Sequence, residues 1–117
     1  MKASDRYLVK GVTCSLDGQS MKVANLSVGG LFAATALPPM PGQVVSLELT
    51  LGDRPPFPVL GTVTWINQAD QPKVPELPQG FGVKITRVAF PHKLAILDLL
   101  KRAKPQSRTA KRQPPSS

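Results

Sequence analysis

Asn25 and Ser27, with the glycine pair that follows them, are residues whose types and spacing suit ligand binding; they lie in the stretch NLSVGGLF at 25–32. On an extended chain, residues two apart point to the same face, so their Cα atoms would be about 7 Å apart on one side. The amide and the hydroxyl would form a polar ledge of hydrogen-bond donors and acceptors. Gly29 and Gly30 permit positive φ and let a ligand approach bare backbone closely.

The same residues also suit an ordinary polar turn between two strands. In such a turn, Asn and Ser side chains hydrogen-bond to nearby backbone groups. Residue types and spacing alone leave the binding ledge and the turn as open alternatives.

The sequence carries no pattern for catalysis or metal binding. The single histidine, His92, lies at the start of a predicted helix without a local carboxylate or cysteine pattern, and we expect it to be exposed. A phosphate-binding glycine-lysine loop and a paired-acid constellation are both missing. Cys14 is the only cysteine, so it forms neither an internal disulfide nor a zinc site, and we expect it in the core. The sequence therefore predicts that the protein is not an enzyme and holds no cofactor.

Length and composition predict one domain in a soluble, cytoplasmic protein. The chain has 117 residues, of which 41% are hydrophobic, which is enough for one core. No run approaches the roughly 18 apolar residues of a membrane span, and the N-terminus lacks the layout of a secretory signal.

The formal net charge of +8 is concentrated at the C-terminus. Six basic residues and no acidic ones follow position 98, whereas residues 1–98 hold nine basic and seven acidic side chains. From Lys104 onward the chain is mostly Pro, Ser, Gln, Lys and Arg, which cannot bury enough surface to offset chain entropy. We expect residues 104–117 to be a disordered basic tail, either a solubilising end or a binding arm for nucleic acid or an acidic partner.

Residues 1–103 read mainly as strands. The segment 44–51, VVSLELTL, alternates apolar and other residues, and 59–66, VLGTVTWI, places Val59, Gly61, Val63 and Trp65 on one face of a predicted central strand. The segment 80–88 repeats the pattern, and two further strand segments flank Asp17-Gly18, a dipeptide that favours a tight hairpin.

Proline-rich stretches at 37–43, 52–58 and 68–80 separate these segments as loops. Only 91–103 has helical spacing, with an apolar stripe that includes Leu94, Leu97 and Leu100. The order is five or six antiparallel strands and then one helix, and so short a sheet protects its edges most easily by curling into a small barrel.

Four segments in this order resemble the PilZ domain family. NLSVGGLF is similar to its [D/N]-x-S-x-x-G signature, with Asn25, Ser27 and Gly30 in the signature positions. LPPMPGQVVSLELTL resembles its proline-glycine loop and following strand, VLGTVTWI its V-x-G-x-V-x-W strand, and GFGVKITRV its G-[IV]-G-V-x-F strand. The resemblance implies a six-stranded antiparallel PilZ-type β-barrel with a C-terminal α-helix over residues 1–103, and it implies binding of the bacterial second messenger cyclic di-GMP.

The second signature of the family, R-x-x-x-R, is similar to RYLVK here, with Arg6 in the first position and Lys10 in the second. Arginine suits the ligand because its planar fork pairs bidentately with guanine or phosphate, whereas lysine keeps the charge and loses the fork. In one strand, Arg6 and Lys10 would lie about 13 Å apart, so they converge on one nucleotide only if the chain bends. They are otherwise solvated surface charges.

Two functions follow from the resemblance, and a third comes from the basic charge. The first is a cyclic di-GMP receptor that acts on a protein partner, using Arg6, Lys10, Asn25, Ser27, Gly29 and Gly30. The second is a degenerate PilZ adaptor in motility, type IV pilus or polarity regulation, which does not bind nucleotide tightly. The third, a barrel for single-stranded nucleic acid, is disfavoured because the six aromatic residues lie mostly at core-like positions.

Overall fold

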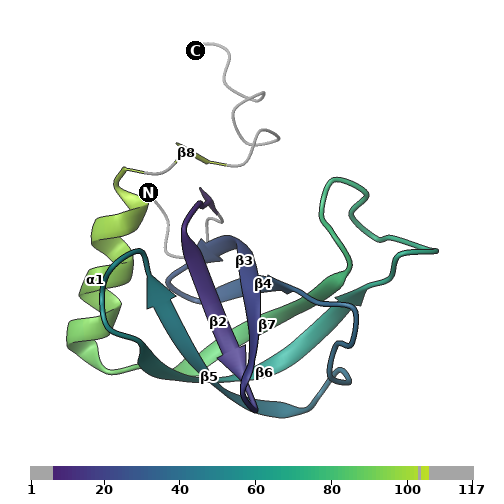
Figure 1. Cartoon of the computed structure of the whole chain (residues 1–117), viewed down its shortest axis with the longest axis horizontal. Coiled ribbons are helices and arrows are strands. Elements are labelled where there is room, and N and C mark those ends of the chain that lie inside the picture. Colours follow the sequence, from purple (N-terminus) through teal and green to yellow (C-terminus); the bar gives the residue numbers. More distant parts are fainter. Residues whose placement is uncertain (1–6, 103, 106–117) are drawn as a thin grey trace.

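The computed structural model describes residues 7–102 and 104–105, and Figure 1 shows the arrangement of their elements. In chain order, these are β1 (Tyr7–Leu8), β2 (Val12–Leu16), β3 (Gln19–Ser27), β4 (Gly30–Ala34), β5 (Val44–Leu51), β6 (Phe57–Asn67), β7 (Gly80–Arg87), α1 (Phe90–Leu100) and β8 (Lys104–Pro105).

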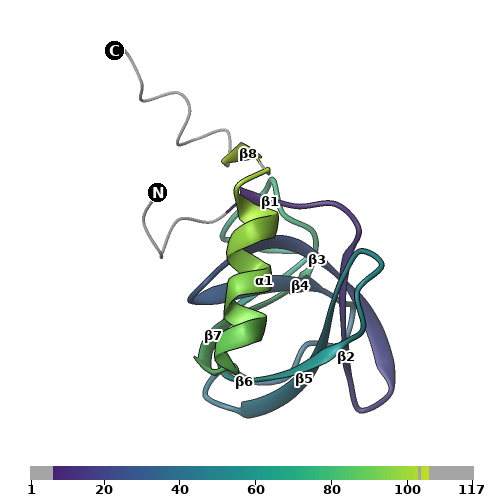
Figure 2. The same ribbon diagram turned by 90° about the vertical axis from the view of Figure 1, so that its left-hand side faces the viewer.

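Six of these strands form a closed barrel. They follow the order β2-β5-β6-β7-β4-β3, every neighbouring pair is antiparallel, and pairing of β2 with β3 closes the ring. Closure pairs the edges that an open sheet would expose. The helix α1 lies along one outer side of the barrel (Figure 2). The predicted six-stranded barrel followed by one helix is confirmed.

Two short strands, β1 and β8, extend the sheet beside β3. β1 pairs with β3, and β8 pairs with β1, both in antiparallel fashion. The alternating sequence over 7–16 predicts one strand, but Gly11, at φ 72°, separates β1 from β2. Residues 104–105 of the predicted tail form β8, whereas 106–117 lie outside the described residues.

The barrel core follows the predicted alternation in most strands. Burial alternates along β5, whose buried side chains are Val45, Leu47, Leu49 and Leu51. Asp17 and Gly18 make the predicted hairpin between β2 and β3, with φ values of 52° and 81° that suit a type I′ turn. Cys14 packs in the core, as predicted.

A β-bulge in β6 reverses the side of the sheet that Trp65 faces. The register between β6 and β7 shifts between Val63 and Trp65, so that Trp65 lies opposite Gly82. Trp65 is not part of the core cluster, whereas Ile66 packs against it. The predicted strict alternation from Val59 onward is therefore wrong at Trp65, because a bulge inserts one residue and exchanges the two faces after it.

The helix α1 packs on the barrel through a different stripe from the one predicted. Ile96 and Leu100 are buried, with Ala95 and Leu99 packed beside them, while Leu94 is exposed. The prediction was wrong at Leu94 because apolar residues lie all around this helix, and its periodicity does not select one face. Among the described residues, α1 falls short of the length and apolar character of a bilayer span.

His92 is half-buried, which corrects the prediction that it would be exposed. Its ring stacks on Phe57, with the two ring centroids 4.3 Å apart. Phe57 begins β6 inside the stretch predicted as a loop, so no sequence pattern indicated this contact.

The loop between β6 and β7 is organised by Asn67, a buried residue at the end of β6. The Asn67 amide nitrogen donates to the carbonyl oxygens of Val74, Leu77 and Pro78, at 3.0 to 3.1 Å. Its side-chain oxygen accepts from the backbone N–H of Val74 at 3.0 Å. One side chain therefore ties together a loop that has no regular strand or helix of its own.

Candidate functional site

Ser27 closes the turn between β3 and β4. It lies opposite Gly30 in the register, and its hydroxyl donates to the Gly30 carbonyl oxygen at 3.2 Å. The same oxygen accepts from the backbone N–H of Gly29, also at 3.2 Å. A serine hydroxyl has one donor and two acceptor positions, so these bonds use its donor and one of its acceptor positions.

Asn25 immediately precedes Leu26 in β3, and it lies on the same face of the strand as Ser27, as predicted. Leu26 and Leu31 pair across β3 and β4 and point into the core, so the neighbouring pairs Asn25–Phe32 and Ser27–Gly30 face outward. The two polar residues are buried rather than displayed on an open ledge: Asn25 is 3% exposed and Ser27 is 1% exposed.

The outward-facing side of β1, β3, β4, β7 and β6, here called the outer face, carries two rows of residues that cross the strands. The pairings place Leu8, Asn25, Phe32, Gly82 and Trp65 in one row. The next row holds Ser27, Gly30, Lys84 and Thr62. Residues from five strands thus lie side by side on one face of the sheet.

Trp65 covers the middle of the first row. Its ring lies 5.3 Å from that of Phe32, between ring centroids, in a tilted arrangement. A Cβ atom at Gly82 would overlap the indole, so only glycine leaves room for it. The bulge in β6 is what brings Trp65 to this side, next to the row that carries Asn25.

Lys84 is the charged residue nearest to the turn along the described rows. It pairs directly with Gly30, its side chain is exposed, and within residues 7–102 it makes no ion pair. Neighbouring strands lie about 4.8 Å apart, which puts the Cα of Lys84 roughly 10 Å from that of Ser27, within reach of a shared ligand. Sequence reasoning missed Lys84 because it is far from the turn in sequence and alternation marks it only as outward-facing.

Lys10, in contrast, lies away from Ser27. β1 runs antiparallel to β3, with Leu8 opposite Asn25, and the Val9 N–H donates to the Ala24 carbonyl oxygen at 3.4 Å. After Val9 the chain therefore runs away from Ser27, and Lys10 lies beyond the last paired residue of β1. Its side chain is exposed. Arg6, the other predicted cation, lies outside the described residues.

Gly29 and Gly30 do not use the backbone freedom that glycine permits. The described glycines with positive φ are Gly11, Gly18, Gly42 and Gly52. A Cβ atom added at Gly29 would meet nothing within 4 Å, so the turn is open at that position. The close approach of a ligand to this backbone stays a prediction.

Comparison with known proteins identifies the family. A protein-family model for the PilZ domain matches residues 5–102, nearly the whole chain, so the chain belongs to the PilZ domain family. PilZ domains form a family that binds cyclic di-GMP and is not a catalytic family. No curated protein matches the chain.

Proposed function

We propose that this chain is a cytoplasmic receptor for cyclic di-GMP that acts by binding a protein partner. The observation that carries the proposal is the register of β3, β4 and β7. It places the exposed cation Lys84 opposite Gly30, on the same face as Asn25 and Ser27. An anionic nucleotide needs both a cation and directional polar groups, and this face provides them together.

The groups of this face have complementary roles in the proposal. Lys84 contacts a phosphate, and Ser27 uses its remaining acceptor position for a guanine N–H. The open space at Gly29 admits the ligand close to the backbone. In this proposal Arg6 and Lys10 supply further positive charge that engages phosphate or guanine.

The burial of Asn25 and Ser27 favours a second candidate, a PilZ adaptor in motility, type IV pilus or polarity regulation that does not bind nucleotide tightly. In this case both residues serve the β3–β4 turn, consistent with the two hydrogen bonds of the Ser27 hydroxyl. Their replacement would lower stability without changing any nucleotide affinity.

Calorimetric titration of the purified chain with cyclic di-GMP, up to about 100 μM, separates the two candidates. Binding weaker than about −5.5 kcal/mol would hardly serve a scarce messenger. The receptor requires binding that Ser27→Ala weakens in a variant shown to be folded, and that Lys10→Arg strengthens by supplying a bidentate fork. Absence of heat in the parent chain and in Lys10→Arg leaves the adaptor.

A further inference from the structure

The outer side of α1 is an apolar surface on a helix that the barrel covers only from the other side. Phe90 is 67% exposed and Leu94 is 49% exposed, while Leu97 is half-buried. Their spacing of four and then three residues aligns them in one stripe along the helix. Figure 2 shows α1 on the outside of the barrel, with its outer side free of any other described element.

The length of this stripe suits a helical partner. Lys101 continues the same line after Leu97, and the distance from residue 90 to residue 101 is about 16 Å at 1.5 Å per residue. Anchors at positions i, i+4 and i+7 are the pattern by which one helix packs against another. We call residues 90, 94, 97 and 101 the α1 stripe.

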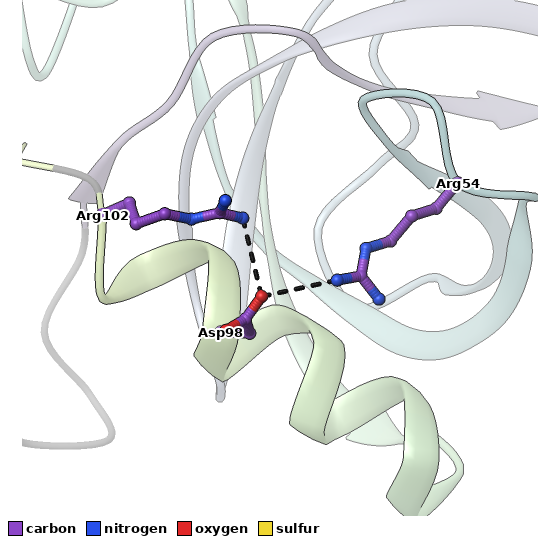
Figure 3. Close-up of polar contacts among 3 residues, drawn as sticks. All are labelled: Arg54, Asp98 and Arg102. Carbon is purple, nitrogen blue, oxygen red and sulfur yellow. Dashed lines mark hydrogen bonds and ion pairs between the residues drawn. The ribbon is translucent and has the colours of Figure 1, made fainter.

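The charges around the α1 stripe are mainly positive. Lys93 flanks it on one side, exposed Lys101 ends it, and exposed Arg87 precedes it. The only acidic residue of α1, Asp98, is already paired: its Oδ2 lies 3.4 Å from Arg54 Nη2 and 3.5 Å from Arg102 Nη2 (Figure 3). The charged residues around the α1 stripe, here called the rim, therefore carry a net positive charge.

This charge distribution selects the kind of partner. If two copies of the chain packed their stripes against each other, the positive charges of Lys93 and Lys101 on each copy would be brought close to those of the other. Like charges brought together oppose association, whereas glutamates and aspartates beside an apolar stripe would complement the rim. We propose that the α1 stripe docks an acidic amphipathic helix of another protein.

The proposal can be tested with three synthetic peptides of about 20 residues, long enough to form helix. One carries a leucine stripe with glutamate elsewhere, the second replaces glutamate with lysine, and the third scrambles the acidic sequence so that the stripe is lost. Fluorescence anisotropy with the full chain should show binding of the first peptide only. The scrambled peptide controls for simple attraction to the basic C-terminus.

Leu94→Gln should weaken binding of the acidic peptide by about tenfold, which is about 1.4 kcal/mol, because it removes a central apolar anchor. The neutral glutamine avoids charge repulsion, and Leu94 is exposed, so the fold should persist. Leu37→Gln, at another exposed leucine on the β4–β5 loop, is the matched control and should leave affinity unchanged.

Three results would overturn the proposal. The first is equal binding of the acidic striped and scrambled peptides. The second is an affinity that Leu94→Gln leaves unchanged. The third is a dimer of the chain in light scattering that Leu94→Gln converts to a monomer, which would make the stripe an interface between two copies.

Discussion

At the scale of single residues, the role of each polar group in the proposed site depends on which hydrogen-bonding positions it does not use within the protein. The Ser27 hydroxyl donates its proton to the Gly30 carbonyl oxygen and accepts from the Gly29 N–H, so the proposed contact with a ligand would use it only as an acceptor. Lys84 keeps all three of its donors free of ion pairs among the described residues. In the proposed site, the turn would therefore supply an acceptor and the neighbouring strand β7 a cation.

We expect Lys84→Met to weaken cyclic di-GMP binding by roughly tenfold and to reduce its dependence on salt, because one phosphate contact would be lost. The matched control is Lys73→Met, which removes the same charge from an exposed position in the β6–β7 loop. Titrations at two salt concentrations measure both effects. If the parent chain binds and the two variants behave alike, Lys84 is not a ligand contact.

Cys14 should be unreactive in the folded protein. Desolvation by burial raises the pKa of its thiol from 9.0 to about 12, so the reactive thiolate is scarce at neutral pH. Because the folded pKa is the higher one, this group opposes stability as pH rises above about 9, where the unfolded chain loses its proton first. Iodoacetamide labelling at pH 8 should be slow in buffer and fast in denaturant; rapid labelling of folded protein would contradict the burial.

At the scale of elements, the β6 bulge and Gly82 on β7 together determine where Trp65 lies. The bulge turns Trp65 outward, and Gly82 on β7 provides the space that the indole fills. Thr64, which lies between Val63 and Trp65 at the bulge, donates from its hydroxyl to the Gly82 carbonyl oxygen at 3.3 Å. A bulge re-aims a side chain at the cost of a local break in the ladder, and here the re-aimed side chain covers Phe32.

Gly82→Ala should lower the free energy of unfolding by about 1–3 kcal/mol, because the added methyl group collides with the indole. Trp65→Leu removes the obstacle, so Gly82→Ala should cost less in a Trp65→Leu background than in the parent. Urea denaturation of the two single variants and the double variant measures this coupling. Additive effects would show that the contact between Gly82 and Trp65 does not limit substitution.

At the scale of the whole molecule, most of the net positive charge lies after the residues that form the barrel. The barrel region is nearly balanced, whereas the six charges after position 98 give the C-terminus its basic character. The last strand, β8, pairs with β1 and joins the two ends of the described chain beside β3. Truncations should therefore preserve residue 105.

Removing residues 106–117 should leave the melting temperature within about 2 °C of the parent, because this composition offers few apolar groups to bury. The circular dichroism spectrum should remain β-dominated with a minor helical part. Removal of 104–117 should be more costly, since it deletes β8 along with its pairing to Tyr7 and Leu8. A large drop on removing 106–117 alone would mean that the predicted disordered tail packs on the barrel.

The sequence by itself determined the barrel, the β2–β3 hairpin and the single helix, because alternation, turn dipeptides and helical spacing are local signals. It also placed Asn25 and Ser27 on one face, since residues two apart in a strand always share a side. The tertiary structure decided which other residues lie on the same face as Asn25 and Ser27. A β-bulge in β6 that no local sequence pattern predicts turned Trp65 outward, and strand pairing placed Lys84 beside Gly30. The tertiary structure also decided which side of α1 is exposed. A helix that is apolar all around has no preferred face until the barrel covers one side.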